Sequence, residues 1–154
     1  MREIKFRAAS AQAPEDVVRW IYGAYVKHLP YTPAPIANGP IPEYDYEYAI
    51  VHDGFSDWQM PRNLEATPIR PETVGEYTGL HDRNGKEIYE GDVLRDENGD
   101  LYKVKFDGGQ FQPLLRYGGT QVAIESIVDM ADYSSVIGNI YENPELLGAR
   151  DEQK

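Results

Sequence analysis

Histidines and carboxylates are the side chains of this sequence with the greatest capacity for catalysis or metal binding. The three histidines, His28, His52 and His81, lie far apart and show neither His-x-x-His nor His-Glu-x-x-His spacing. The sequence contains no cysteine, so thiolate metal sites and disulfides are excluded. We therefore expect no metal site, no cofactor and no metal requirement.

Acidic residues gather at three turns. Glu87, Glu90 and Asp92 surround one turn and could supply a general acid and base, the alternative being a solvated turn. Segments that begin at Asp82 and Asp96 resemble calcium loops, but neither has the bidentate Glu that an EF-hand needs at position twelve. We interpret both segments as hairpin turns.

No motif for nucleophilic catalysis is found in the sequence. The segment Gly54-Phe55-Ser56-Asp57-Trp58 has Trp where a Gly-x-Ser-x-Gly elbow needs its second Gly. Neither a Gly-x-Gly-x-x-Gly fingerprint nor a phosphate-binding loop is present. We expect no catalytic residues, and the protein is not expected to be an enzyme.

Three tyrosines form the most distinctive pattern. Tyr44, Tyr46 and Tyr48 alternate with Asp45 and Glu47, which in a strand places the three rings on one face. Acidic neighbours disfavour stacking on nucleic-acid bases, which needs interleaved basic residues, whereas Tyr is enriched at protein interfaces. The three rings either cover the core of their own domain or form an interface with a second copy or another protein.

Composition and charge narrow the class of protein. The chain has 154 residues with 41% hydrophobic and 27% charged side chains, which is typical of a folded globular protein. No apolar run approaches the ~18 residues of a membrane-spanning helix, and residues 1–7 lack the apolar core of a secretory signal. We expect a cytoplasmic protein without membrane association.

The formal net charge is −11, and most of it falls in the second half. Residues 1–75 have 7 basic and 10 acidic side chains, a net of −3, and residues 76–154 have 8 and 16, a net of −8. A negative field repels phosphate, so nucleic-acid binding is not expected. The basic clusters are two small ones: Arg2, Lys5 and Arg7 near the N-terminus, and the pair Lys103 and Lys105.

The first 74 residues are expected to form an α+β portion. Alternation predicts a strand over residues 3–8, and Pro14, the following acids and a three- and four-residue apolar spacing predict one helix over 14–29. A proline-rich loop follows at 30–43. A second strand is predicted at 44–51, and a short one is allowed near 64–69.

From residue 75 onward, short strands alternate with glycine turns. Strands are predicted at 87–89, 92–96, 101–106, 111–115, 121–124 and 135–141. Turns are predicted at Asn84-Gly85, Asn98-Gly99, Gly108-Gly109 and Gly118-Gly119. The spacing favours a small antiparallel SH3-like β-barrel over residues 75–147, followed by a flexible tail at 148–154. The fold class is thus mostly β (α+β).

Three segments carry a family resemblance: residues 2–8, 76–94 and 136–147. They include Thr78-Gly79-Leu80, the run Ile88-Tyr89-Glu90-Gly91-Asp92-Val93, and Val136-Ile137-Gly138-Asn139-Ile140-Tyr141. Together they resemble the YopX family of phage and prophage proteins. The resemblance implies a phage-encoded protein made in a bacterial cytoplasm, and it implies no particular activity.

The function expected from the sequence is that of an accessory protein that acts by binding, with a protein as its partner. That partner is a second copy or a host or phage protein, and Tyr44, Tyr46 and Tyr48 are the candidate interface. The alternative is a nucleic-acid-associated small β-barrel protein that uses Lys103 and Lys105.

Overall fold

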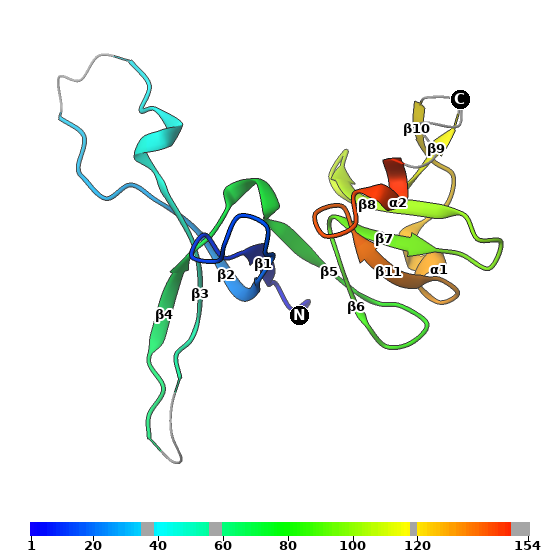
Figure 1. Ribbon diagram of the computed structural model, residues 1–154, viewed down its shortest axis with the longest axis horizontal. Helices are drawn as coiled ribbons and strands as arrows, with labels where there is room; N and C mark the ends of the chain where they lie inside the picture. The colour runs from blue at the N-terminus through cyan, green and yellow to red at the C-terminus, as the bar shows by residue number, and fades with distance from the viewer. Residues whose placement is uncertain (35–38, 56–59, 118–119, 149–154) are drawn as a thin grey trace. The chain divides into compact units, whose positions relative to one another are not determined.

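The computed structural model describes residues 1–34, 39–55, 60–117 and 120–148 (Figure 1). The fold is mostly β, as the sequence predicts. It contains two antiparallel sheets and few helices. The chain divides into two compact units. The N-terminal unit is Lys5–Val74, and the C-terminal unit combines Met1–Ile4 with Gly75–Lys154.

Four antiparallel strands build the N-terminal unit, in the order β4-β3-β2-β1. Their bounds are Phe6–Ala9 (β1), Trp20–His28 (β2), Glu47–Asp53 (β3) and Leu64–Pro68 (β4). Two single-turn 3-10 helices, Glu43–Asp45 (η1) and Pro71–Thr73 (η2), precede β3 and follow β4. The β3–β4 hairpin extends away from the rest of its unit (Figure 1).

The core of this unit lies on one face of the sheet. Ala8, Ile50 and Ile69 are buried there. Partly buried side chains pack around them: Phe6, Ile21, Tyr25, Tyr48 and Val74. The alternation of strand residues explains which side chains lie on the core face. Tyr25 is paired with Ile50 across the sheet, so both side chains point to the same face.

The helix predicted over residues 14–29 is wrong, because β2 occupies Trp20–His28. Aromatic and β-branched residues make this run a good strand, and pairing with both β1 and β3 overrides the helical spacing. Gly23 permits the pairing: a Cβ atom at this position would lie 2.2 Å from the carbonyl oxygen of Val51. Residues before Trp20 form turns, such as Val17 N–H to Pro14 C=O at 2.9 Å.

The other N-terminal predictions hold with shifted bounds. The strand expected at 3–8 is observed at Phe6–Ala9, and the one allowed near 64–69 is observed at Leu64–Pro68. The strand expected at 44–51 begins only at Glu47. In the proline-rich loop, residues 30–34 and 39–42 are irregular, while residues 35–38 lie outside the described residues.

The C-terminal unit contains the β5–β6 hairpin and a five-stranded antiparallel sheet of order β10-β9-β8-β7-β11. The hairpin strands are Gly75–His81 (β5) and Glu87–Tyr89 (β6). The sheet strands are Asp92–Arg95 (β7), Leu101–Asp107 (β8), Gln110–Tyr117 (β9), Thr120–Ala123 (β10) and Ser135–Asn139 (β11). Two short helices, Ile127–Ala131 (α1) and Glu145–Gly148 (α2), were not expected from the sequence.

The six strands predicted after residue 75 are all observed, and β5 is an additional one. The hairpin at Asn98-Gly99 is confirmed, because Leu94 is paired with Tyr102. The turn at Gly118-Gly119 lies outside the described residues, as do residues 149–154 of the predicted tail.

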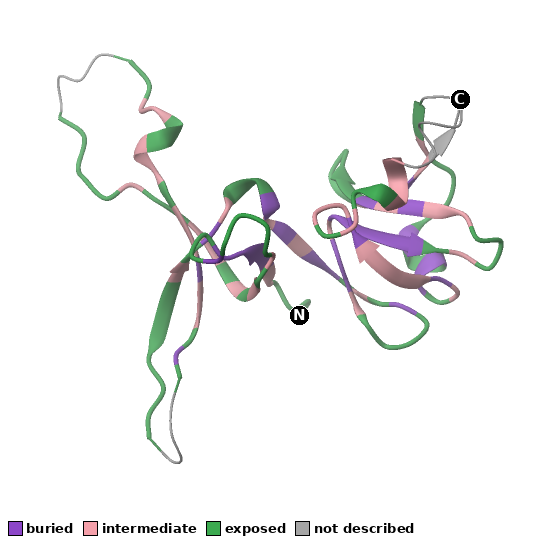
Figure 2. Ribbon diagram, viewed as in Figure 1, coloured by how far each residue is buried: buried purple, intermediate pink, exposed green. Residues whose placement is uncertain are grey.

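The expected closed SH3-like barrel is not found among the described residues. Their sheet is open, with β10 at one edge and β11 at the other. The chain between these two strands forms α1, and its buried residues Ile127 and Met130 join the core of the unit beside Leu94 and Tyr102. Figure 2 shows that most of β7 is buried. None of the helices in the described part of the chain has the length and hydropathy needed to cross a membrane.

Candidate binding surface

The three predicted interface tyrosines occupy three different local structures. Tyr44 lies in η1 and is 87% exposed, Tyr46 lies in the bend that follows, and only Tyr48 lies in β3. The expectation that one strand face holds all three is therefore wrong. The 3-10 turn causes the difference, because Asp45 N–H donates to Pro42 C=O at 3.1 Å and bends the chain before the strand begins.

The Tyr48 side chain is held by contacts on the core face of the sheet. Its ring is stacked on Tyr25 with centroids 6.4 Å apart, and Tyr25 contacts Phe6 at 5.7 Å. The hydroxyl of Tyr48 donates to the Oε2 atom of Glu43. This hydrogen bond raises the pKa of the Tyr48 hydroxyl, because the phenolate would face a carboxylate.

Lys27 ties the 3-10 turn to the sheet. Its Nζ atom donates to Glu43 Oε1 at 2.8 Å and lies 4.3 Å from the centre of the Tyr46 ring. The hydrogen bond raises the pKa of Lys27 and lowers that of Glu43. An ammonium group is thus held by a carboxylate and an aromatic face, a pairing that the ring quadrupole favours.

Tyr31 adds a second exposed ring that the sequence analysis missed. It is 47% exposed, and its hydroxyl donates to Asp45 Oδ2 at 2.5 Å. That bond raises the pKa of Tyr31. Tyr31 lies in the proline-rich loop, so only the structure brings it to the acidic turn that also carries Tyr44.

An open hollow of about 440 Å³ lies beside the tyrosines on β3 and β4. Its lining consists of Tyr46, Glu47, Tyr48, Ala49, Ala66, Pro68 and Ile69. Glu47 is the only charged residue of that lining, so the hollow combines aromatic and aliphatic walls with one carboxylate.

The outer face of the four-stranded sheet continues this apolar surface. By strand alternation it carries Tyr22, Ala24, Val26, Ala49, Val51, Leu64, Ala66 and Pro68. Tyr22 is 49% exposed and Leu64 is 74% exposed. β4 is largely exposed in Figure 2.

Each of the three histidines has its own local surroundings. His52 contacts Thr67 Oγ1 through Nε2 at 2.6 Å, and His81 Nε2 lies 3.5 Å from the hydroxyl of Tyr77. His28 is exposed at the end of β2. Over the described residues, no group of three or more His, Cys, Asp or Glu side chains is placed to hold a metal ion.

The acidic turn near residue 90 is held by main-chain contacts. Asp92 is buried, and its Oδ2 atom accepts from Tyr89 N–H at 2.8 Å, while Glu90 Oε2 accepts from Phe106 N–H at 2.9 Å. Glu87 lies in β6 and is half-buried. These contacts account for Glu90 and Asp92 as turn-stabilising residues.

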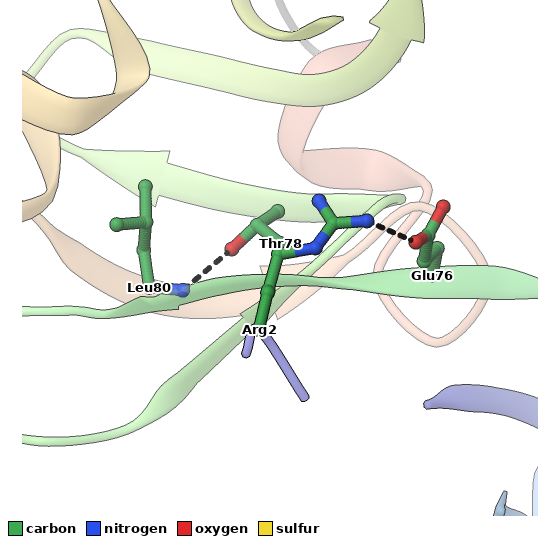
Figure 3. Close-up of polar contacts among 4 residues, drawn as sticks. All are labelled: Arg2, Glu76, Thr78 and Leu80. Atoms are coloured by element: carbon green, nitrogen blue, oxygen red, sulfur yellow. Dashed lines mark hydrogen bonds and ion pairs between the residues drawn. The ribbon is translucent and has the colours of Figure 1, made fainter. Parts of the chain in front are cut away.

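A second hollow, of about 330 Å³, lies in the C-terminal unit. Figure 3 shows three of its lining residues, Arg2, Thr78 and Leu80. Leu80 N–H donates to Thr78 Oγ1 at 3.2 Å, and Arg2 Nη2 contacts Glu76 Oε1, outside the lining, at 3.0 Å. Phe106 and Phe111 also line it and form an edge-to-face pair at 5.0 Å.

The two lysines of the nucleic-acid alternative lie on β8. Lys103 is half-buried and Lys105 is exposed. Both point to the same face by alternation. The strand also ends in Asp107, so these two positive charges are partly offset, and the structure adds nothing to the case for nucleic acid.

The architecture is that of a small, mostly β protein with two antiparallel sheets. The model of the YopX protein family matches residues 42–148, and the chain belongs to this family. The resemblance seen in the sequence is thereby confirmed. Among solved structures, the crystal structure of protein EF1440 from Enterococcus faecalis is similar, with a TM-score of 0.53 and 21% identity over 96% of this chain and 99% of that one. At this identity the likeness is one of fold. No curated protein matches the chain.

Proposed function

We propose that this protein is a non-enzymatic, phage-encoded accessory protein of the bacterial cytoplasm. It binds another protein through the tyrosine-rich end of its N-terminal unit. The observation that carries the proposal is the 87% exposure of Tyr44 on a turn that is tied to the sheet by Lys27, Glu43 and Tyr48. Family membership supports the phage origin, and the absence of cysteine fits a reducing compartment.

Tyrosine is suited to this role for physical reasons. Its ring offers a large contact area, its hydroxyl tolerates water when no partner is bound, and few torsions must be frozen on binding. Because the turn is already held in place, binding costs less ordering entropy than it would for a free loop. The neighbouring Glu43, Asp45 and Glu47 disfavour phosphate, so a protein is a better partner than nucleic acid.

Partner capture tests the proposal. The tagged full chain is expressed in the bacterial host during phage infection, and proteins recovered with it are identified by mass spectrometry. We expect at least one protein that the wild type recovers and Tyr44→Ser does not. Ile124→Ser is the matched control, because Ile124 is 60% exposed and lies in the C-terminal unit. Equal recovery by Tyr44→Ser and the wild type would contradict the proposal.

A further inference from the structure

The edge strand β4 presents main-chain groups that other strands would use for pairing. Ile69 N–H donates to Tyr48 C=O at 3.1 Å, and Gly54 N–H donates to Asn63 C=O at 2.7 Å. Residues 63 and 69 therefore face β3, and so do 65 and 67 by alternation. The N–H and C=O groups of Leu64 and Ala66 point away from β3, where no strand of the described residues is paired with them.

At the end of β4 and directly after it, the same edge of the chain already forms main-chain hydrogen bonds with residues 9 and 11. Ala11 N–H donates to Pro68 C=O at 2.9 Å, and Arg70 N–H donates to Ala9 C=O at 2.8 Å. This short bridge shows that the outward side of the segment accepts an antiparallel strand. The open part of the edge runs from Leu64 to Ala66, next to the hollow that Ala66 and Pro68 help to line.

The charge around the hollow selects a basic occupant. Glu43, Asp45 and Glu47 outnumber Lys27 and Arg70, the residue that follows Ile69 of the lining. These five side chains give this end of the unit a net charge of −1 (2 − 3). The contacts of Lys27 with Glu43 and the Tyr46 ring show the chemistry by which this surface holds an ammonium group. Glu47, which lines the hollow, offers a second carboxylate.

We infer that β4 accepts an extended segment of a partner protein as an added strand, with a lysine or arginine of that segment lying across Ala66 toward Glu47. Main-chain hydrogen bonds to Leu64 and Ala66 supply affinity, and the hollow supplies the preference for a basic side chain. The inference rests on the proposed function, since it names the chemistry of the partner.

A second copy of the chain fits this edge less well. A two-fold pairing centred on Ala66 places Leu64 opposite Pro68, which has no N–H and whose carbonyl is already bonded to Ala11. A pairing centred on Glu65 places two carboxylates opposite each other, which is unfavourable.

Peptide titration of the full chain, followed by amide NMR, tests the inference. The probe is a blocked eight-residue peptide of alternating valine and threonine with one central lysine. We expect the amide signals of Leu64 and Ala66 to shift, and about fivefold weaker binding when glutamine replaces the lysine, the effect of one partly exposed ion pair. Glu47→Gln should remove this preference.

Two changes separate main-chain pairing from simple contact. Ala66→Pro deletes an N–H that points away from β3, so it should abolish peptide binding while Ala66→Val retains it. Methylating alternate peptide nitrogens should also abolish binding, and this measurement stands if Ala66→Pro does not fold.

Several results would overturn the inference. They are unshifted Leu64 and Ala66 signals at millimolar peptide, equal binding of the lysine and glutamine peptides, or a dimer that Ala66→Pro converts to a monomer. If Tyr44→Ser loses its captured protein while Ala66→Pro keeps it, the proposed function stands and this inference fails.

Discussion

Substituting Gly23 tests the assignment of residues 20–28 to a strand. In β2 a Cβ atom at this position would lie 2.2 Å from the Val51 carbonyl oxygen and 3.0 Å from Ile50 Cγ2. Because one of these atoms belongs to the backbone of β3, relief requires the two strands to separate. Overpacking of this kind costs about 1–3 kcal/mol, and the backbone clash places Gly23→Ala near the upper value. In a chain of 154 residues that corresponds to a loss of roughly 6–12 °C in Tm.

The helix suggested by the apolar spacing makes the opposite prediction. In a helix interior, Gly→Ala stabilises by up to about 1 kcal/mol. Thermal and urea denaturation of the full chain, followed by circular dichroism, distinguish the two. Gly148→Ala is the control, since nothing lies within 4 Å of its Cβ position in α2. A Gly23→Ala variant as stable as the wild type would refute the reasoning.

Three further predictions concern the C-terminal unit. Burial raises the pKa of Asp82, but main-chain donors including Val136 N–H at 2.8 Å outweigh it and lower the pKa overall. Asp82→Asn should therefore cost about 2 kcal/mol in urea denaturation at neutral pH. The difference from wild type should shrink as pH falls below about 4 and through the lowered pKa of the folded state, because the carboxylate stabilises only while it is ionised. Burial, followed by a hydrogen bond to Asp96 at 3.0 Å, raises the pKa of Tyr102 to about 12. Asp96→Asn should lower that pKa in an NMR titration of the ring, and an unchanged value would contradict the role of the carboxylate. Labelled DNA and RNA should show no submicromolar binding at ~150 mM salt in a gel-shift assay, since 16 acidic and 8 basic residues lie beyond position 75.

The hairpins of the C-terminal unit could be predicted because their signals are local. At Asn98-Gly99, Asp96 Oδ1 accepts from Asn98 N–H at 2.9 Å and Gly99 has a φ of +84°, so turn chemistry and strand alternation agree. The helix α1 was missed because it has five residues, although Ser126 is its N-cap and accepts from Val128 N–H at 3.2 Å. The sequence signal that could have predicted this helix is Ser126 followed three positions later by Asp129, a pattern typical of a helix N-terminus.

The strand β2 could not be predicted from local sequence. Its apolar residues satisfy a helical spacing. The segment is a strand because it is paired with β3, for example Tyr25 with Ile50, which lies 25 positions further along the chain. The candidate surface could be predicted only in part, because it too depends on contacts between distant residues. Tyrosine type and acidic neighbours are visible in the sequence, but the contacts of Glu43 with Lys27 and Tyr48 depend on the folded sheet.

The central claim is that the tyrosine-rich end of the N-terminal unit contacts a protein partner. Site-specific photo-crosslinking in infected cells tests it most directly, with a photoreactive phenylalanine in place of Tyr44 and, as control, in place of Ile124. Both positions are exposed, at 87% and 60%. We predict a discrete crosslinked product from position 44 and none of the same mass from position 124. No discrete product at position 44, or the same product at both positions, would contradict the claim.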